Sequence, residues 1–286
     1  RSEKALEIVT VTLNNMMNGG IFDHVNGGFA RYSVDADWHI PHFEKMLYDN
    51  AQLLSLYAEA YKVTGNQRYL EVIAQTHEFI SREMTDESGA FYTALDADSE
   101  GEEGKYYVWT YDELKAIIGS DFKAFKKVFD ISTSGNFEHG TNHLVRRSMV
   151  DVNDEQLAKW RLLLATDRKN RIRPALDNKV LTSWNALMIS GYTDAYFATG
   201  NTTYLNAALK AADFIAKQML KEDGSLLRNY NKGKAGISGF LEDYSFTCEA
   251  FIALYKATYN ETWLMLARTT ADYTIQHFYS VQSGFF

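Results

Sequence analysis

The chain has 286 residues, of which 46% are hydrophobic and 23% charged, a balance typical of a globular protein with a sizeable core. Its formal net charge of −8 argues against nucleic acid as a partner, because an acidic chain gains nothing from counterion release at phosphates. No apolar run approaches a membrane span and no signal peptide is visible, so we expect a soluble, cytoplasmic chain without a membrane partner.

Residues 3–17 predict the first helix, and the motif that follows it runs from Asp35 to Asn50. Pro41 suits the first turn of a helix, which would place His42 and Glu44 near the N-terminal end of that helix. A histidine with a carboxylate close by is a candidate general acid or base. The alternative for Glu44 is a carboxylate that stabilises the helix dipole.

A sequence pattern that is repeated around three turns predicts helical hairpins. Before each turn, apolar residues recur at steps of three and four, and after it a second helix is expected to run to Met84, Met219 or Phe278. A glycine near the end of each second helix opens a longer connection. The three turns align without gaps on Thr64, Thr199 and Thr258, in the segments Tyr61–Asn66, Tyr196–Asn201 and Tyr255–Asn260.

The segment from Phe91 to Gly104 carries alternating acidic residues. Asp96 and Asp98 resemble the opening of a calcium loop, but Tyr107 stands at the twelfth position, which excludes an EF-hand. The strand-like run Tyr106–Trp109 suggests a β-hairpin over the mouth of the site. Paired carboxylates would serve acid–base chemistry on sugars, whereas a solvated acidic loop is the alternative interpretation.

The loop Gly135–His143 and two later motifs complete the polar segments. His139 and His143 would suit a metal only on a helix, and Gly140 argues against one, so we expect no metal site. The later motifs are Asp177–Asn185 and Gly239–Tyr244. In the register of the repeat, Trp184 and Asn185 match Asp49 and Asn50 in the first unit and Asp243 and Tyr244 in the last.

The helices predict an all-α fold of stacked hairpins. A diverged hairpin is expected at Tyr111–Asp130 and Asp154–Asp167, which brings the count to nine main helices. Both ends look cut through a continuing pattern, three helices short of six hairpins. We therefore predict one α/α toroid domain over residues 1–286, incomplete at both ends, with a short β-hairpin in a long loop; an open helical array is the competing architecture. The polar motifs lie in the long connections, which meet at one end of such a toroid.

These motifs resemble the YyaL-like family, whose animal members are called spermatogenesis-associated proteins. The resemblance implies a toroid similar to six-hairpin glycosidases and N-acylglucosamine 2-epimerases, preceded in the whole protein by a thioredoxin-like domain that is absent here. His143 stands where an aliphatic residue is expected, which weakens a role for its loop. The resemblance rests on Gly19–Asp23, Gly27–Tyr32, Pro41–Ala51, Asp96–Gly101, Lys179–Asn185 and Leu241–Tyr244.

We therefore expect a carbohydrate-active domain, either a sugar epimerase/isomerase or a glycoside hydrolase, that takes a small-molecule sugar and needs no cofactor. His42 would be the acid/base, with Glu44, Asp96, Asp98, Glu242 and Asp243 as catalytic carboxylates. The substrate-binding candidates are Trp38, Asp49, Asn50, Trp109, Trp184, Asn185 and Tyr244. One alternative is a non-catalytic domain that binds a glycan or a protein and works with the thioredoxin-like domain. A third interpretation is that the motifs are helix caps and bridges between helices.

The single cysteine, Cys248, cannot form an internal disulfide. It lies in an apolar helical run, so we interpret it as a small buried hydrophobe rather than a nucleophile.

Overall fold

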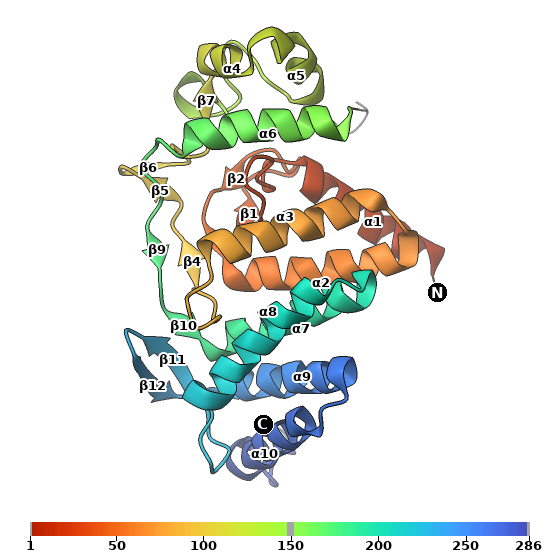
Figure 1. Ribbon diagram of the computed structural model, residues 1–286, viewed down its shortest axis with the longest axis vertical. Coiled ribbons are helices and arrows are strands. Elements are labelled where there is room, and N and C mark those ends of the chain that lie inside the picture. Colours follow the sequence, from red (N-terminus) through yellow and green to blue (C-terminus); the bar gives the residue numbers. More distant parts are fainter. Residues whose placement is uncertain (1, 148–151, 285–286) are drawn as a thin grey trace. The chain divides into compact units, whose positions relative to one another are not determined.

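The computed structural model describes residues 2–147 and 152–284. Contacts divide the chain into two compact units. The first unit comprises Arg1–Met46 and Leu95–Leu176, and the second comprises Leu47–Ala94 and Asp177–Phe286. Ten α-helices fall within the described residues (Figure 1).

The first unit combines four helices with short strands. The helices are α1 (Glu3–Asn18), α4 (Tyr111–Ile118), α5 (Phe122–Val128) and α6 (Asp154–Arg168), with 3-10 turns at Gly119–Asp121 and Glu138–Gly140. The antiparallel strand pairs are β1 (Tyr32–Ser33) with β2 (Pro41–His42), β5 (Asp98–Ser99) with β6 (Glu102–Glu103), and β7 (Trp109–Thr110) with β8 (Thr141–Asn142). Strand β3 (Lys45–Met46) closes the first segment of this unit, and β9 (Leu176–Asp177) spans the end of its second segment.

The core of the first unit lies under α6. Trp160 and Leu164 of this helix pack against Leu114 of α4 and Phe125 of α5, and all four side chains are buried. Two parts of α6 are therefore held differently: its middle is held by apolar packing, and its last residue, Arg168, is held by charge.

The second unit contains the helical hairpins. Its helices are α2 (Leu47–Thr64) with α3 (Gln67–Glu83), α7 (Thr182–Thr199) with α8 (Thr202–Phe214), and α9 (Leu241–Thr258) with α10 (Glu261–Phe278). A π-helical turn, Ile215–Met219, extends α8. Strands β10 (Val180–Leu181), β11 (Leu227–Asn231) and β12 (Lys234–Ser238) form one antiparallel sheet in that order, and β4 (Ala94–Leu95) begins at the end of this unit's first segment.

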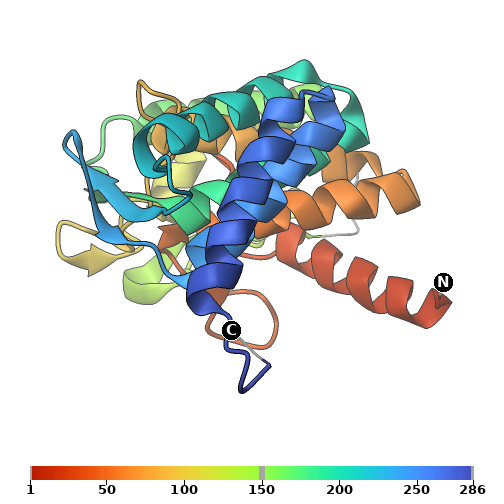
Figure 2. The same cartoon turned by 90° about the horizontal axis from the view of Figure 1, so that it is seen from below.

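Helix α7 lies at the centre of the second unit and packs against α2, α8 and α9. The view in Figure 2 shows the last hairpin, α9 and α10, as two adjacent helices. Gly191 of α7 allows close packing on α2, because a Cβ at this position would lie 2.6 Å from the carbonyl oxygen of Ala51. The central helix is therefore held by backbone proximity as well as by apolar side chains.

The predicted repeat is confirmed at its turns. The first helices end at Thr64, Thr199 and Thr258, and the second helices start one residue after Asn66, Asn201 and Asn260. Each asparagine side chain accepts the backbone N–H two residues on, which caps the second helix. The residue between threonine and asparagine is left-handed each time, as Gly65, Gly200 or Tyr259.

Two element predictions were wrong. Pro41 does not begin a helix: Pro41 and His42 pair with Ser33 and Tyr32 as strand β2, and the helix starts only at Leu47. The fixed φ of proline suits an edge strand as well as a first helical turn, so the local pattern could not decide.

The expected helix Tyr111–Asp130 is two helices, because Gly119 is left-handed with a φ of 64° and ends α4. The β-hairpin in the acidic loop is confirmed, but its strands are Asp98–Ser99 and Glu102–Glu103. Of the run Tyr106–Trp109, only Trp109 lies in a strand.

Within residues 2–147 and 152–284, no helix has both the length and the apolar character that crossing a membrane requires.

Candidate functional site

The imidazole of His42 is held by a carboxylate. Nδ1 of His42, on β2, lies 2.6 Å from Oε1 of Glu103, on β6. The same oxygen accepts the backbone N–H of Phe43 at 3.2 Å. An ionised carboxylate can only accept, so Nδ1 is the donor when it bonds to an ionised Glu103, and a neutral imidazole in that pair carries its lone pair on Nε2. The fold therefore presents Nε2 of His42 as the atom available to exchange a proton.

Two further side chains surround the His42 ring. The ring of Tyr32 stacks on it at a centroid distance of 4.9 Å and an angle of 20°. Oε2 of Glu44 lies 3.8 Å from Nε2 and also accepts a hydrogen bond from Arg31 at 3.0 Å. Side-chain exposure is 25% for both His42 and Glu44, so a ligand can reach them while the ring stays positioned.

A cleft of about 840 Å³ lies within the first unit, and it reaches this pair through Glu103, whereas His42 and Glu44 are not among its lining residues. Glu103 lines it, together with the rings of Tyr106 and Phe137. The volume lies in the range of small-molecule sites, and aromatic walls suit the apolar faces of a sugar. Six carboxylates line the cleft against two basic side chains, Lys105 and Arg171; the acidic ones are Glu100, Glu102, Glu103, Glu113, Glu138 and Asp167.

Glu103, the carboxylate that contacts His42, was not among the residues predicted from the sequence. Glu103 follows Asp96 and Asp98 in the same acidic run, and in the β5–β6 hairpin Asp98 lies directly opposite Glu103. Directly opposite residues of an antiparallel pair project to the same face, so Asp98 and Glu103 share one side of the hairpin. Asp96 is exposed and its Oδ1 accepts the backbone N–H of Asp98 at 3.3 Å.

The two tryptophans of the first unit differ in their surroundings. Trp38 is half-buried and has a left-handed backbone, with a φ of 60°. Trp109 is only 1% exposed, and its Nε1–H donates to Asp167 at 2.8 Å. The guanidinium groups of Arg168 and Arg171 lie 4.9 and 4.7 Å from its ring centroid. This enclosure favours a packing role for Trp109 over that of a stacking wall.

In the second unit, Asp243 joins two helix starts. It is fully buried, and its Oδ1 accepts the backbone N–H of Ser183. Its Oδ2 accepts the backbone N–H of Phe240 and a hydrogen bond from the guanidinium Nη1 of Arg228. Glu242, which is about half exposed, also accepts from Arg228 at 2.7 Å. These contacts favour the capping and bridging interpretation for Asp243 and leave Glu242 accessible.

The other candidates of the second unit are mostly interior. Asn185 is fully buried and exchanges two hydrogen bonds with the backbone of Phe91, at 2.7 and 2.9 Å. Tyr244 is buried and its hydroxyl accepts the N–H of Leu226. Trp184 packs edge-on against Tyr48, at 4.7 Å between ring centroids. Asn50 is fully buried and Asp49 half-buried.

Because these residues belong to the second unit and His42 to the first, their convergence on one end of the toroid stays a prediction.

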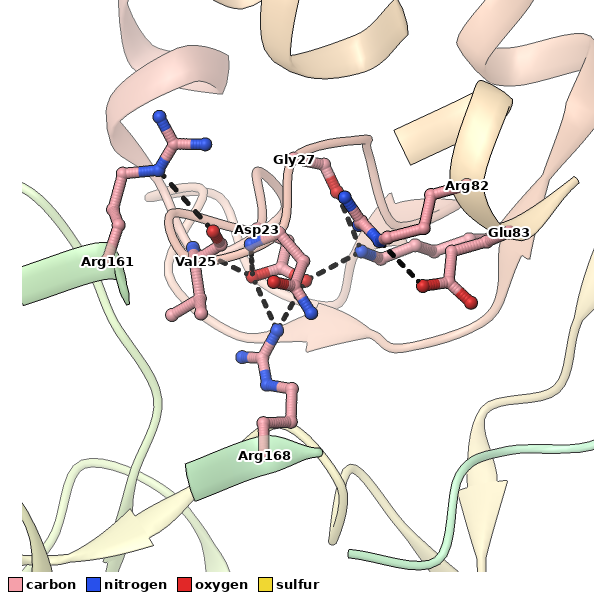
Figure 3. Close-up of polar contacts among 9 residues, drawn as sticks. Asp23, Val25, Gly27, Arg82, Glu83, Arg161 and Arg168 are labelled. Carbon is pink, nitrogen blue, oxygen red and sulfur yellow. Dashed lines mark hydrogen bonds and ion pairs between the residues drawn. The ribbon is translucent and has the colours of Figure 1, made fainter. Parts of the chain in front are cut away.

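A buried charge cluster of the first unit was missed altogether. Asp23 accepts from Arg168 Nη1 at 3.0 and 2.8 Å and from Lys45 Nζ at 2.8 Å (Figure 3). Burial by itself would raise the pKa of the Asp23 carboxyl, but the charges of Arg168 and Lys45 outweigh it and hold that pKa well below its usual range. The partners lie 22 and 145 residues away in the chain, so no local pattern could have revealed them.

Two further features concern the side chains that commonly bind metals and the single cysteine. Among residues 2–147 and 152–284, no three histidine, cysteine, aspartate or glutamate side chains are grouped closely enough to hold a metal. Burial raises the pKa of Cys248 to about 11, and its Sγ–H lies 3.5 Å from the carbonyl oxygen of Ala267. Such a thiol stays protonated near neutral pH, although Cys248 is half-buried and not fully buried as predicted.

Comparison with known proteins supports this reading of the fold. The chain is similar to spermatogenesis-associated protein 20. It is 33% identical to the human protein and 34% identical to the mouse protein, over 98% of this chain in both cases. It covers 42% and 41% of those two proteins, so it spans about two fifths of their length. The thioredoxin-like domain implied by the family resemblance therefore stays a prediction.

A family model described as the catalytic domain of GH127 β-L-arabinofuranosidase matches residues 163–283. Unsaturated glucuronyl hydrolase from Bacillus sp. GL1 is 13% identical with a TM-score of 0.56, over 98% of this chain and 58% of that enzyme. A family 76 glycoside hydrolase from a bovine Bacteroides thetaiotaomicron strain is 14% identical with a TM-score of 0.54, over 96% of this chain and 42% of that enzyme. The predicted six-hairpin glycosidase-like fold is thereby confirmed.

Proposed function

We propose that this chain is a carbohydrate-active enzyme domain in which His42 is the general acid and base and Glu103 its partner carboxylate. The observation that carries the proposal is the 2.6 Å contact between Nδ1 of His42 and Oε1 of Glu103, a carboxylate that lines a cleft of about 840 Å³. Glu103 fixes the ring orientation and stabilises the imidazolium that forms when Nε2 takes a proton. The relatives in fold that act on sugars support carbohydrate as the substrate class.

The geometry favours proton transfer at carbon, as in a sugar epimerase or isomerase. Glycoside hydrolysis commonly uses two carboxyl groups that face each other across the scissile bond. Here Glu103 and Glu44 flank one imidazole instead, at 2.6 Å from Nδ1 and 3.8 Å from Nε2. In the proposed reaction, Nε2 removes the proton from the carbon next to the carbonyl group of an open-chain sugar. The electrons of the broken C–H bond move to the carbonyl oxygen and give an enediolate. The protonated His42 returns a proton to the opposite face of that carbon after the enediolate has turned, which restores the carbonyl group and gives the epimer.

Hydrolysis of a glycosidic bond is the second candidate, because the GH127 catalytic-domain model matches residues 163–283. In that case the protonated His42 would donate its Nε2 proton to the leaving oxygen, and a carboxylate would activate water or attack carbon. Asp98, which lies opposite Glu103 in the hairpin, is the candidate for that second carboxyl group.

One experiment separates these reactions. The protein is incubated in D₂O with a panel of mono- and disaccharides, and deuterium incorporation next to the carbonyl group is followed by NMR. In parallel, nitrophenol release is measured from a panel of nitrophenyl glycosides. Deuterium uptake supports the epimerase and nitrophenol release the hydrolase. His42→Ala should abolish either signal, whereas His277→Ala, which changes an exposed histidine of α10, should not.

Thermal shift with the same sugars tests the non-catalytic alternative. A sugar that raises the Tm of the wild-type protein without turnover would favour a glycan-binding domain. Turnover that is equally fast in His42→Ala would overturn the role of His42.

A further inference from the structure

Arg168, the last residue of α6, and its two charged partners, Asp23 and Lys45, are all buried. Relative exposure of the Arg168, Lys45 and Asp23 side chains is 2%, 3% and 6%. Asp23 also accepts the backbone N–H groups of Val25 and Asn26, which fixes the glycine-rich loop that contains it (Figure 3). A buried charge that loses its partner strongly destabilises the fold, so each of the three side chains fixes the position of the other two.

The guanidinium of Arg168 lies over the aromatic rings that follow strand β6. Its central carbon is 5.5 Å from the ring centroid of Tyr106, 5.2 Å from that of Tyr107 and 4.9 Å from that of Trp109. The ammonium of Lys45 also lies over Tyr107, at 5.1 Å. Cations over aromatic faces attract them, and the planar guanidinium adds stacking. Arg168 therefore links this aromatic segment to Asp23, and the Asp23 carboxylate also fixes the glycine-rich loop.

The aromatic segment leads directly to the His42–Glu103 pair. The ring of Tyr107 stacks on that of Phe43 at 5.3 Å and 11°. Phe43 follows His42 in the chain, and its N–H donates to the same Glu103 oxygen that accepts from His42. The Phe43 ring also lies against Gly104, where a Cβ would be 2.4 Å from the ring. No larger residue fits at Gly104 without moving Phe43, so the ring is enclosed beside Glu103.

From this chain of contacts we infer that Arg168 is a positioning residue for the His42–Glu103 pair. It acts through Tyr107 and Phe43, and it is anchored by Asp23 and Lys45. A shift of the Phe43 backbone displaces the N–H and the imidazole that share one Glu103 oxygen, so the bond at Nδ1 depends on the buried cluster. The turnover part of the inference rests on the proposed function, whereas the geometric part can be measured on the protein alone.

The geometric test is NMR of the His42 ring. The Nδ1–H resonance and the tautomer of His42 are compared between the wild-type protein and three variants, Arg168→Lys, Arg168→Met and Tyr107→Leu. Arg168→Lys keeps the charge but loses the planar fork, and Tyr107→Leu leaves all three buried charges in place. Leu164→Ala is the matched control, because it removes a buried side chain of the same helix that packs in the core of α4, α5 and α6.

We expect the Nδ1–H resonance of His42 to be lost in the Arg168 and Tyr107 variants and kept in Leu164→Ala. If a sugar is turned over, kcat should fall by about 10²-fold in Arg168→Lys and Tyr107→Leu with KM changed far less, as for a misplaced catalytic group. A resonance that persists unchanged in folded Tyr107→Leu or Arg168→Lys overturns the inference, whatever the activity. Failure to find any turnover counts against the proposed function and leaves the NMR comparison decisive for the positioning.

Discussion

His42 Nδ1 and Glu103 Oε1 lie 2.6 Å apart although 61 residues separate them in the chain. The contact joins strand β2 to strand β6 of the acidic hairpin, at the residue pair farthest from its turn, and it gives the imidazole a fixed orientation and a fixed tautomer. A carboxylate in this position stabilises the charged imidazole only while it remains ionised, which makes Glu103 separable from His42 by experiment.

Replacing Glu103 by Gln should leave the shape of the pair nearly intact and remove its charge. If the proposed reaction is found, we expect kcat to fall by about 10²- to 10⁴-fold, because the imidazolium loses its counter-charge. Steady-state kinetics over a range of pH provides the measurement. Asp112→Asn, on the exposed side of α4, is the control and should retain wild-type rates. Wild-type turnover in Glu103→Gln would remove Glu103 from the mechanism.

Trp109→Ala should act on stability rather than on sugar selectivity. The side chain is 1% exposed and packs against two guanidinium groups, so its loss should cost about 3–5 kcal/mol of unfolding free energy. Urea denaturation measures that loss. Trp109→Phe should cost less but still lose the hydrogen bond to Asp167. Unchanged stability with weakened sugar binding would instead identify Trp109 as a stacking wall.

Stability should fall as the pH drops from 7.5 to 5, because two histidines are buried in neutral form. Burial lowers the pKa of His24 and of His143 to about 4, although carbonyl groups of Gly19 and His39 partly oppose the effect. The unfolded chain takes up these protons near pH 6.5, and the folded chain only near pH 4. Between those values the unfolded state binds more protons, so stability is lost as the pH falls.

Over this interval each histidine should contribute about 2 kcal/mol to the loss of unfolding free energy. Urea denaturation at pH 7.5 and pH 5 gives the difference directly. His143→Gln should reduce that difference, even though it weakens the fold at pH 7.5 by removing the bond to the His39 carbonyl. A pH dependence identical to that of wild type would show that His143 does not titrate in this way.

The three asparagines of the repeat should contribute equally to the free energy of unfolding. Asn66→Ala, Asn201→Ala and Asn260→Ala each remove the side-chain acceptor at a helix start, and each should cost about 1 kcal/mol. Thermal unfolding of the three variants tests the equivalence. Replacement by Asp, which also accepts at this position, should restore most of the loss. Unequal losses that Asp does not restore would argue for a role other than capping.

Gly191→Ala should lower the Tm although alanine is the better helix former. The added Cβ would lie 2.6 Å from the backbone oxygen of Ala51, so α2 and α7 must separate. Overpacking typically costs about 1–3 kcal/mol, which exceeds or offsets the gain of about 1 kcal/mol in helix propensity. Ser190→Ala, one residue earlier in α7, is the control. A rise in Tm for Gly191→Ala would mean that the two helices have room to separate.

The sequence predicted the helical hairpins well because their signals are local. Apolar spacing sets the helices, and Thr199 and Asn201 form the same hydrogen bonds as their counterparts in the other two repeats. The third residue of each first helix, Asp49, Trp184 or Asp243, also falls where the alignment placed it. These features depend on residues within a few positions of one another.

The candidate site was predicted only in part, because its contacts are not local. His42 was singled out, but its partner Glu103 could not be chosen among the acidic residues of the hairpin without the register that places it opposite Asp98. Asn185 was taken for a substrate ligand because nothing local shows that it bonds the backbone of Phe91.

The sequence by itself therefore determined the helices, their caps and the repeat that orders them, because hydrogen bonds between near neighbours decide these elements. Only the tertiary structure decided which charges meet. Asp23, Lys45 and Arg168 come from three separate segments, and burial makes their pairing obligatory in the fold while leaving no spacing to read in the chain.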